Sequence, residues 1–202
     1  MELIFLATLT ASAFWLVRHL DQRRRIALLA SHLGQFQIEK HMETLTQGYL
    51  RALGEDNPAR QDQILELLRP TELALCSQFA RLATSFAKAG AVEARISKLP
   101  VDLPFAARLM PPQASFDMRQ ALALHARGIQ LAVDRGDGSR RSRAFTVSAE
   151  LFLMQHTCHW FCKSKTVASA RMLARHKTSY QQLLAAVVPE TRSAYSALVG
   201  GN

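Results

Sequence analysis

The stretch Met1–Arg25 reads MELIFLATLTASAFWLVRHLDQRRR and holds fifteen consecutive uncharged residues, Leu3 to Val17. At 1.5 Å per residue this run covers roughly 22 Å of helix, less than the hydrocarbon core of about 30 Å. A snorkelling Arg18 side chain can extend the buried stretch to Leu20, and Trp15 lies where interfacial aromatic residues occur. Residues 1–20 are therefore predicted to form a transmembrane anchor. Its basic and aromatic flank consists of Trp15, Arg18, Arg23, Arg24 and Arg25.

The charges beside the apolar run predict its orientation. Arginines follow the run, and the only charged side chain before it is that of Glu2. By the positive-inside rule the first residues lie outside and residues 21–202 form a cytoplasmic domain of a single-pass inner (cytoplasmic) membrane protein. Two alternatives remain open: a buried first helix of a soluble bundle, and a cleaved signal peptide with Ala11–Ala13 at its cleavage site. A signal peptide, however, begins with a basic segment, which this chain lacks.

Composition predicts that the remainder folds as one globular domain. The chain has 202 residues, of which 49% are hydrophobic and 20% charged. These values are typical of globular proteins and untypical of disordered ones. Three cysteines, an odd and sparse set, indicate a reducing compartment and agree with a cytoplasmic domain.

Apolar residues recur at helical spacing almost throughout the chain. We expect one helix from Ile26 to Gly54, despite a phase shift in the apolar pattern after Phe36, and a helix capped by Asn57 that Pro70 breaks or kinks. A proline-rich crossover is expected at 99–112. No convincing strand alternation is present. The predicted fold class is all-α: the membrane-anchoring helix followed by an irregular bundle of four or five main helices.

Basic residues are concentrated in one segment. From 26 to 134 the acidic and basic residues balance, whereas 135–177 holds nine Lys and Arg against two acidic residues, a net of +7. This asymmetry predicts a polyanionic neighbour, and we expect a basic loop at 136–143 and a basic helix at 163–177. The candidate residues for binding an anionic surface are Arg140, Arg141, Arg143, Lys163, Lys165, Arg171, Arg175 and Lys177.

Four potential metal ligands lie close together in the sequence: His156, Cys158, His159 and Cys162. Thiolates and imidazoles are suitable ligands for zinc, copper or iron. On one helix, however, successive side chains diverge by about 100°, so these four cannot converge on one ion without partners from elsewhere. The favoured interpretation is that Cys158 is a small apolar core residue, and no metal or other cofactor is predicted.

No phosphate-binding loop, dinucleotide fingerprint or catalytic motif is present, which favours a non-enzymatic function. We expect a membrane-tethered scaffold or accessory subunit of an inner-membrane assembly, with the membrane and other protein subunits as partners and anionic lipid as a candidate partner. A nucleic-acid-binding protein that uses the 135–177 segment is the alternative. A metal or redox enzyme centred on His156–Cys162 is a more distant one.

Overall fold

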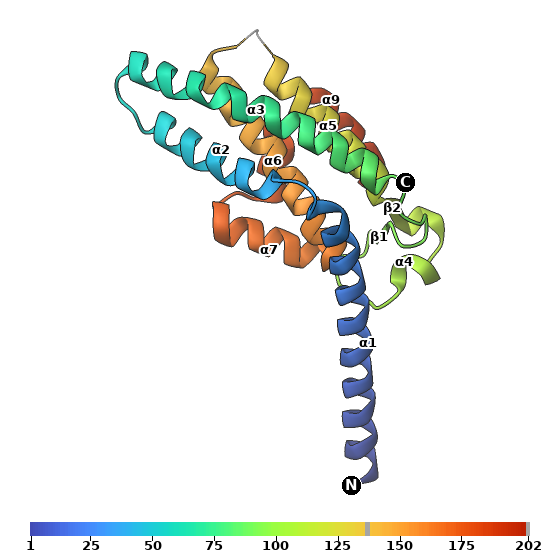
Figure 1. Ribbon diagram of the computed structural model, residues 1–202. Helices are drawn as coiled ribbons and strands as arrows, with labels where there is room; N and C mark the ends of the chain where they lie inside the picture. The colour runs from blue at the N-terminus through green and yellow to red at the C-terminus, as the bar shows by residue number, and fades with distance from the viewer. Residues whose placement is uncertain (136–137, 201–202) are drawn as a thin grey trace.

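The computed structural model describes residues 1–135 and 138–200, and it confirms the all-α prediction. Helix α1 (Glu2–Leu33) is a continuous rod whose first half projects from the domain, whereas its second half packs against α3 and α6 (Figure 1). Leu29 is buried in that contact, and His32 Nδ1 lies 2.8 Å from Ser85 Oγ. One helix therefore serves both as the projection and as part of the domain.

Helices α2 (Ile38–Leu53) and α3 (Pro58–Phe86) form a hairpin. The prediction of one helix from Ile26 to Gly54 is wrong: α1 ends at Leu33, and the chain turns so that α2 can pack on α3. Asn57 caps α3 as predicted, with its Oδ1 accepting from Ala59 N at 3.0 Å. Pro70 does not end α3, because packing against α2 and α5 holds the helix where proline removes one backbone hydrogen bond.

Helix α6 (Arg140–Cys162) is the central element of the domain. It contacts α1, α2, α3, α5 (Met118–Asp134), α7 (Lys165–His176) and α8 (Tyr180–Ala186). Its buried residues cover most of its circumference, including the adjacent pairs 156–157 and 160–161. One face, which includes the exposed Phe145, stays at least partly accessible to solvent. The last helix, α9 (Pro189–Gly200), covers α5.

A small sheet was not expected from the sequence. Strands β1 (Arg95–Ser97) and β2 (Ser115–Asp117) pair antiparallel, with Ile96 opposite Phe116. The proline-rich segment 99–112 connects them and includes α4 (Ala106–Leu109) and the start of η1 (Pro112–Ala114). Figure 1 shows this connection beside α1, where α1 leaves the domain.

Candidate membrane-proximal interface

Exposure changes abruptly along α1. All residues from Met1 to Val17 are exposed, including apolar side chains such as Leu3 at 83% and Trp15 at 63%. Asp21 and Gln22, only one turn beyond, are 4% and 7% exposed. Within the described residues, α1 alone is long and apolar enough to cross a membrane, and none of its apolar window is buried. The apolar half of α1 thus lacks the packing that a core helix of a soluble bundle would have.

A chain of polar contacts fixes α1 where it enters the domain. Arg18 Nε donates to Asp102 Oδ2 at 3.0 Å, and Gln22 Nε2 donates to the same oxygen. Lys163 Nζ in turn donates to Gln22 Oε1. The Asp102 side chain is only 3% exposed, so its charge needs these partners. The contacts connect α1 both to the 99–112 segment and to the turn between α6 and α7.

A second set of contacts involves Asp21, which lies between Arg18 and Gln22 on α1, and Arg25, one turn later. Asp21 pairs with Arg25 at 2.9 Å and accepts a 3.4 Å hydrogen bond from the Phe105 backbone N–H. Phe105 adopts a φ of +55°, a left-handed conformation that costs energy for a bulky residue. The hydrogen bond to the buried Asp21 carboxylate helps to hold Phe105 in this left-handed conformation. Nearby, Thr166 bonds to the Pro100 carbonyl through both its N–H (3.1 Å) and its Oγ1 (2.7 Å).

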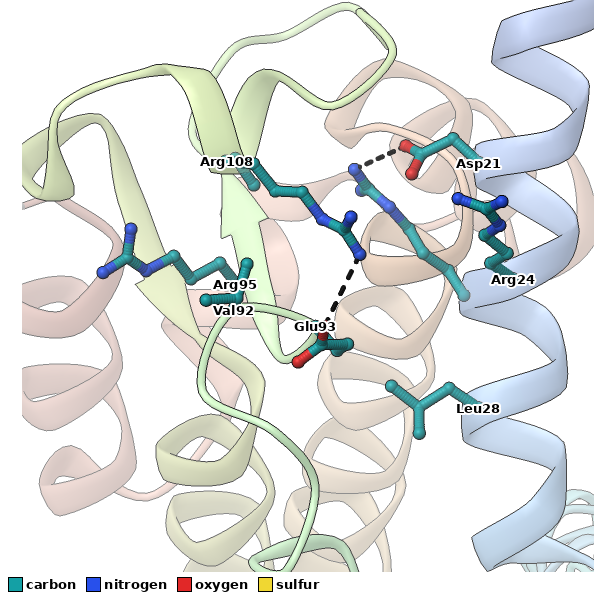
Figure 2. A pocket seen from close by; sticks show the side chains of 9 residues that line it. Asp21, Arg24, Leu28, Val92, Glu93, Arg95 and Arg108 are labelled. Carbon is teal, nitrogen blue, oxygen red and sulfur yellow. Dashed lines mark ion pairs between the residues drawn. The ribbon is translucent and has the colours of Figure 1, made fainter.

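The predicted juxtamembrane arginines lie around this junction. A hollow lies between α1, the loop before β1 and α4 (Figure 2). Its volume is about 240 Å³, and the residues that line it include Arg24, Arg25, Arg95 and Arg108. Its two carboxylates are both paired, Asp21 with Arg25 and Glu93 with Arg108. Arg24 extends from α1 at the side of the hollow, and Arg23 is exposed. Positive charge therefore exceeds negative charge here.

The basic candidates do not form one surface. Arg140, Arg141 and Arg143 belong to the first turn of α6, so the expected basic loop is wrong over these residues, and its positions 136 and 137 lie outside the described residues. Arg140 pairs with Asp62 at 3.1 Å and Glu66 at 3.4 Å. Arg143 Nε lies 3.7 Å from Glu72, whereas Arg141 stacks over the Phe145 ring. This pairing reduces the charge available to a nucleic acid.

The second basic group begins at the opposite end of α6, where Lys163 follows the last residue of the helix, about 33 Å from its first residue along the axis. Helix α7 then folds back along α6, so that His176 stacks on Phe152 near the middle of α6. The expected helix at 163–177 is α7, with Lys163 just before it and Lys177 as its C-cap. Lys165 Nζ lies over the Trp160 and Tyr180 rings, at 5.1 and 4.9 Å. Arg171 and Arg175 border a separate hollow of about 420 Å³ beside His159 and His176. Only the start of this group lies where α1 leaves the domain, with Lys163 in contact with Gln22 of α1, whereas α7 leads away from α1 (Figure 1).

The four metal-ligand candidates face different neighbours. His156 Nε2 lies 3.0 Å from Ser169 Oγ, and His159 Nδ1 lies 3.3 Å from Arg171. Cys158 donates to Met154 Sδ and packs against the core, and burial raises the pKa of its thiol and of the Cys162 thiol. Among the residues described, no three His, Cys, Asp or Glu side chains are grouped to hold an ion. The arrangement gives the metal-enzyme alternative no support.

Burial also shifts the pKa values of three side chains in the core. It lowers the pKa of His125 to about 3 and that of His156 to about 4, the latter also because of nearby Lys165. Desolvation raises the pKa of Glu150 to about 7, although the Val188 N–H donates to its Oε1 at 3.0 Å. His125 Nε2 lies 2.9 Å from Thr157 Oγ1, which contacts Tyr195 Oη at 2.8 Å. These groups are enclosed by the bundle and serve its packing.

The raised pKa of Glu150 predicts that stability falls with rising pH. Between the ordinary value of 4.5 and about 7, the folded protein binds a proton that the unfolded chain releases, so stability is lost as pH rises through this range. Glu150→Gln keeps the acceptor for Val188 without the charge. We expect it to be more stable than wild type at pH 8 by about 2 kcal/mol, with a smaller difference at pH 5.

Thermal unfolding of the full chain in detergent at pH 5, 6, 7 and 8 measures this effect. His125 and His156 act in the opposite direction, because their lowered pKa values destabilise the fold as pH falls below about 6.5. Both histidines are present in the two proteins and cancel from the comparison. Parallel pH profiles for wild type and Glu150→Gln would contradict the prediction.

The chain matches no protein-family model, no curated protein and no solved structure.

Proposed function

We propose that this chain is a single-pass protein of the inner membrane, with the first half of α1 spanning the bilayer and the helical domain held at the cytoplasmic surface. The observation that carries the proposal is the abrupt change in exposure between Val17 and Asp21. Contiguous exposed apolar surface of this extent marks a membrane or protein contact. The seventeen exposed residues Met1–Val17 reach the lower limit for a spanning helix.

The electrostatics of the junction support this orientation. Its three carboxylates, those of Asp21, Glu93 and Asp102, are all engaged in ion pairs. Exposed Arg23 and Arg24 add positive charge beside the end of the apolar run. A basic flank stays on the cytoplasmic side, and each such residue near an anionic leaflet contributes about 1 kcal/mol of attraction.

We further propose that the domain is a non-enzymatic scaffold or accessory subunit. The core polar groups are buried, and, among the residues that the structure describes, the hollow beside α7 that Arg171 and Arg175 border is lined by no Ser, Thr or Cys side chain that could act as a nucleophile. Exposed apolar side chains far from the spanning segment provide contact points for other subunits. These are Leu50 at 68%, Leu67 at 78%, Leu73 at 45% and Phe145 at 53% exposed.

Topology reporters test the proposal. Alkaline phosphatase, active only outside the cytoplasm, is fused to the C-terminus in one strain, and a fluorescent protein that folds in the cytoplasm is fused in another. We expect fluorescence without phosphatase activity, and carbonate-resistant membrane association. The matched control is the same fusion lacking residues 2–17, which we expect in the soluble fraction. Phosphatase activity would overturn the orientation, and release of the full-length fusion by carbonate would overturn the anchor.

A further inference from the structure

A hollow of about 310 Å³ lies beside α1 where the apolar run ends. It is lined by Trp15, Arg18, His19, Gln22, Lys163 and Val167. Four of these residues come from α1, one precedes α7 and one lies in the first turn of α7. If residues up to Val17 lie in the hydrocarbon, this hollow opens at the level of the phospholipid headgroups, which occupy several ångströms on each side of the core.

The hollow carries an excess of positive charge. Of its two cations, Arg18 is neutralised by Asp102, whose side chain is only 3% exposed and does not line the hollow. Lys163 donates to the neutral Gln22 amide oxygen, and within residues 1–135 and 138–200 it has no ion-pair partner. A half-buried ammonium without a carboxylate is suited to bind an anion.

The remaining walls suit a lipid. The Trp15 ring stacks on the His19 imidazole with centroids 5.4 Å apart and planes 5° apart, and Val167 adds an apolar contact. Tryptophan favours the level at which headgroups meet acyl chains. Next to the hollow, the exposed apolar surface of α1, including Leu16 at 52%, is available to the acyl chains of the same molecule.

We propose that this hollow, the α1–α7 hollow, binds the phosphate of an anionic phospholipid of the cytoplasmic leaflet. The inference rests on the proposed membrane function. Lys163 is the principal contact to the phosphate, Arg18 provides a second donor while remaining paired to Asp102, and Trp15 packs against the glycerol region. A bound headgroup would neutralise Lys163 and connect the end of α6 to the bilayer.

The test uses the full chain in a neutral detergent and native mass spectrometry with phosphatidylglycerol as probe. We expect one phosphatidylglycerol to bind preferentially over phosphatidylcholine. Lys163→Gln is expected to weaken the preferred site about fivefold, the factor for one basic residue near an anionic lipid. Lys177→Gln removes the same charge at the far end of α7 and is expected to bind as wild type. Thermal unfolding of both variants establishes that they remain folded.

Each result either supports or overturns the proposal that the α1–α7 hollow binds a phospholipid phosphate. Equal binding by wild type and Lys163→Gln, or equal binding of the two lipids, would overturn it. Inorganic phosphate at the same concentration is a further arm: if it displaces the lipid from wild type, the hollow is a free-phosphate site and the lipid assignment is wrong. The proposed membrane function fails separately, if carbonate releases the protein from the membrane. If the protein stays in the membrane but Lys163→Gln binds phosphatidylglycerol as wild type does, only the proposed phosphate site is wrong.

Discussion

Replacing both Leu6 and Leu9 by arginine is expected to remove the protein from the membrane. Both side chains are more than half exposed and lie near the middle of the exposed apolar stretch. Exchanging one leucine for arginine at the centre of a spanning helix costs about 3 kcal/mol on insertion scales. Two exchanges cost about 6 kcal/mol, which corresponds to roughly a 10⁴-fold change in partitioning.

Carbonate extraction followed by immunodetection in pellet and supernatant measures this change. The matched control is the double variant Leu50→Arg and Leu67→Arg, which places the same substitution at exposed leucines of the domain. We expect this control to stay in the pellet like wild type. A Leu6→Arg, Leu9→Arg protein that remained resistant to carbonate would show that the apolar half of α1 does not hold the protein in the membrane.

Glu72→Ala is expected to destabilise the domain by about 3–5 kcal/mol, the range for removing one partner of a buried ion pair. Glu72 is 1% exposed, accepts from Tyr49 Oη at 2.6 Å and pairs with Arg69 at 3.2 Å. Arg143 lies 3.7 Å from the same carboxylate. Alanine would leave the buried Tyr49 hydroxyl unpaired and two guanidinium groups without their central anion.

Thermal unfolding of the full chain in detergent, followed by circular dichroism, measures the loss. Glu72→Gln keeps an acceptor for Tyr49 but removes the charge, and we expect an intermediate loss. Glu66→Ala is a suitable control, because its partner Arg140 also reaches Asp62 and the side chain is 63% exposed. We expect this control to cost at most about 1 kcal/mol. An equal small effect for Glu66→Ala and Glu72→Ala would contradict a stabilising role for the buried carboxylate.

Features encoded locally in the sequence were predictable. The 3/4 spacing of apolar residues predicted the helical class, and Asn57 followed by Pro58 predicted the start of α3. The turn between α1 and α2 had two local signals, Gly34 at the C-cap of α1 and the phase shift in the apolar pattern after Phe36, but the helical spacing on both sides favoured one uninterrupted helix. Pro70 gave a misleading signal, since tertiary packing on two sides holds α3 together through it.

Only part of the candidate interface around α1 could be predicted from the sequence. The apolar run and its arginines stand side by side in the sequence, so they were found. Asp102, which fixes Arg18, is 84 residues away, and Lys163 is 141 residues from Gln22. No periodicity or motif connects residues so distant. The two basic groups were assigned to one segment because they are close in sequence, whereas in the structure Arg140 and Lys163 lie at opposite ends of α6.

The continuity of α1 has a mechanical consequence. If α1 spans the bilayer as proposed, there is no linker between Val17 and the packed half of the helix that would let the domain turn independently of its anchor. A change in bilayer thickness that tilts the spanning helix would then tilt the whole domain with it. The exposed side chains of Leu50 and Leu67 would change their position relative to the membrane surface as a result.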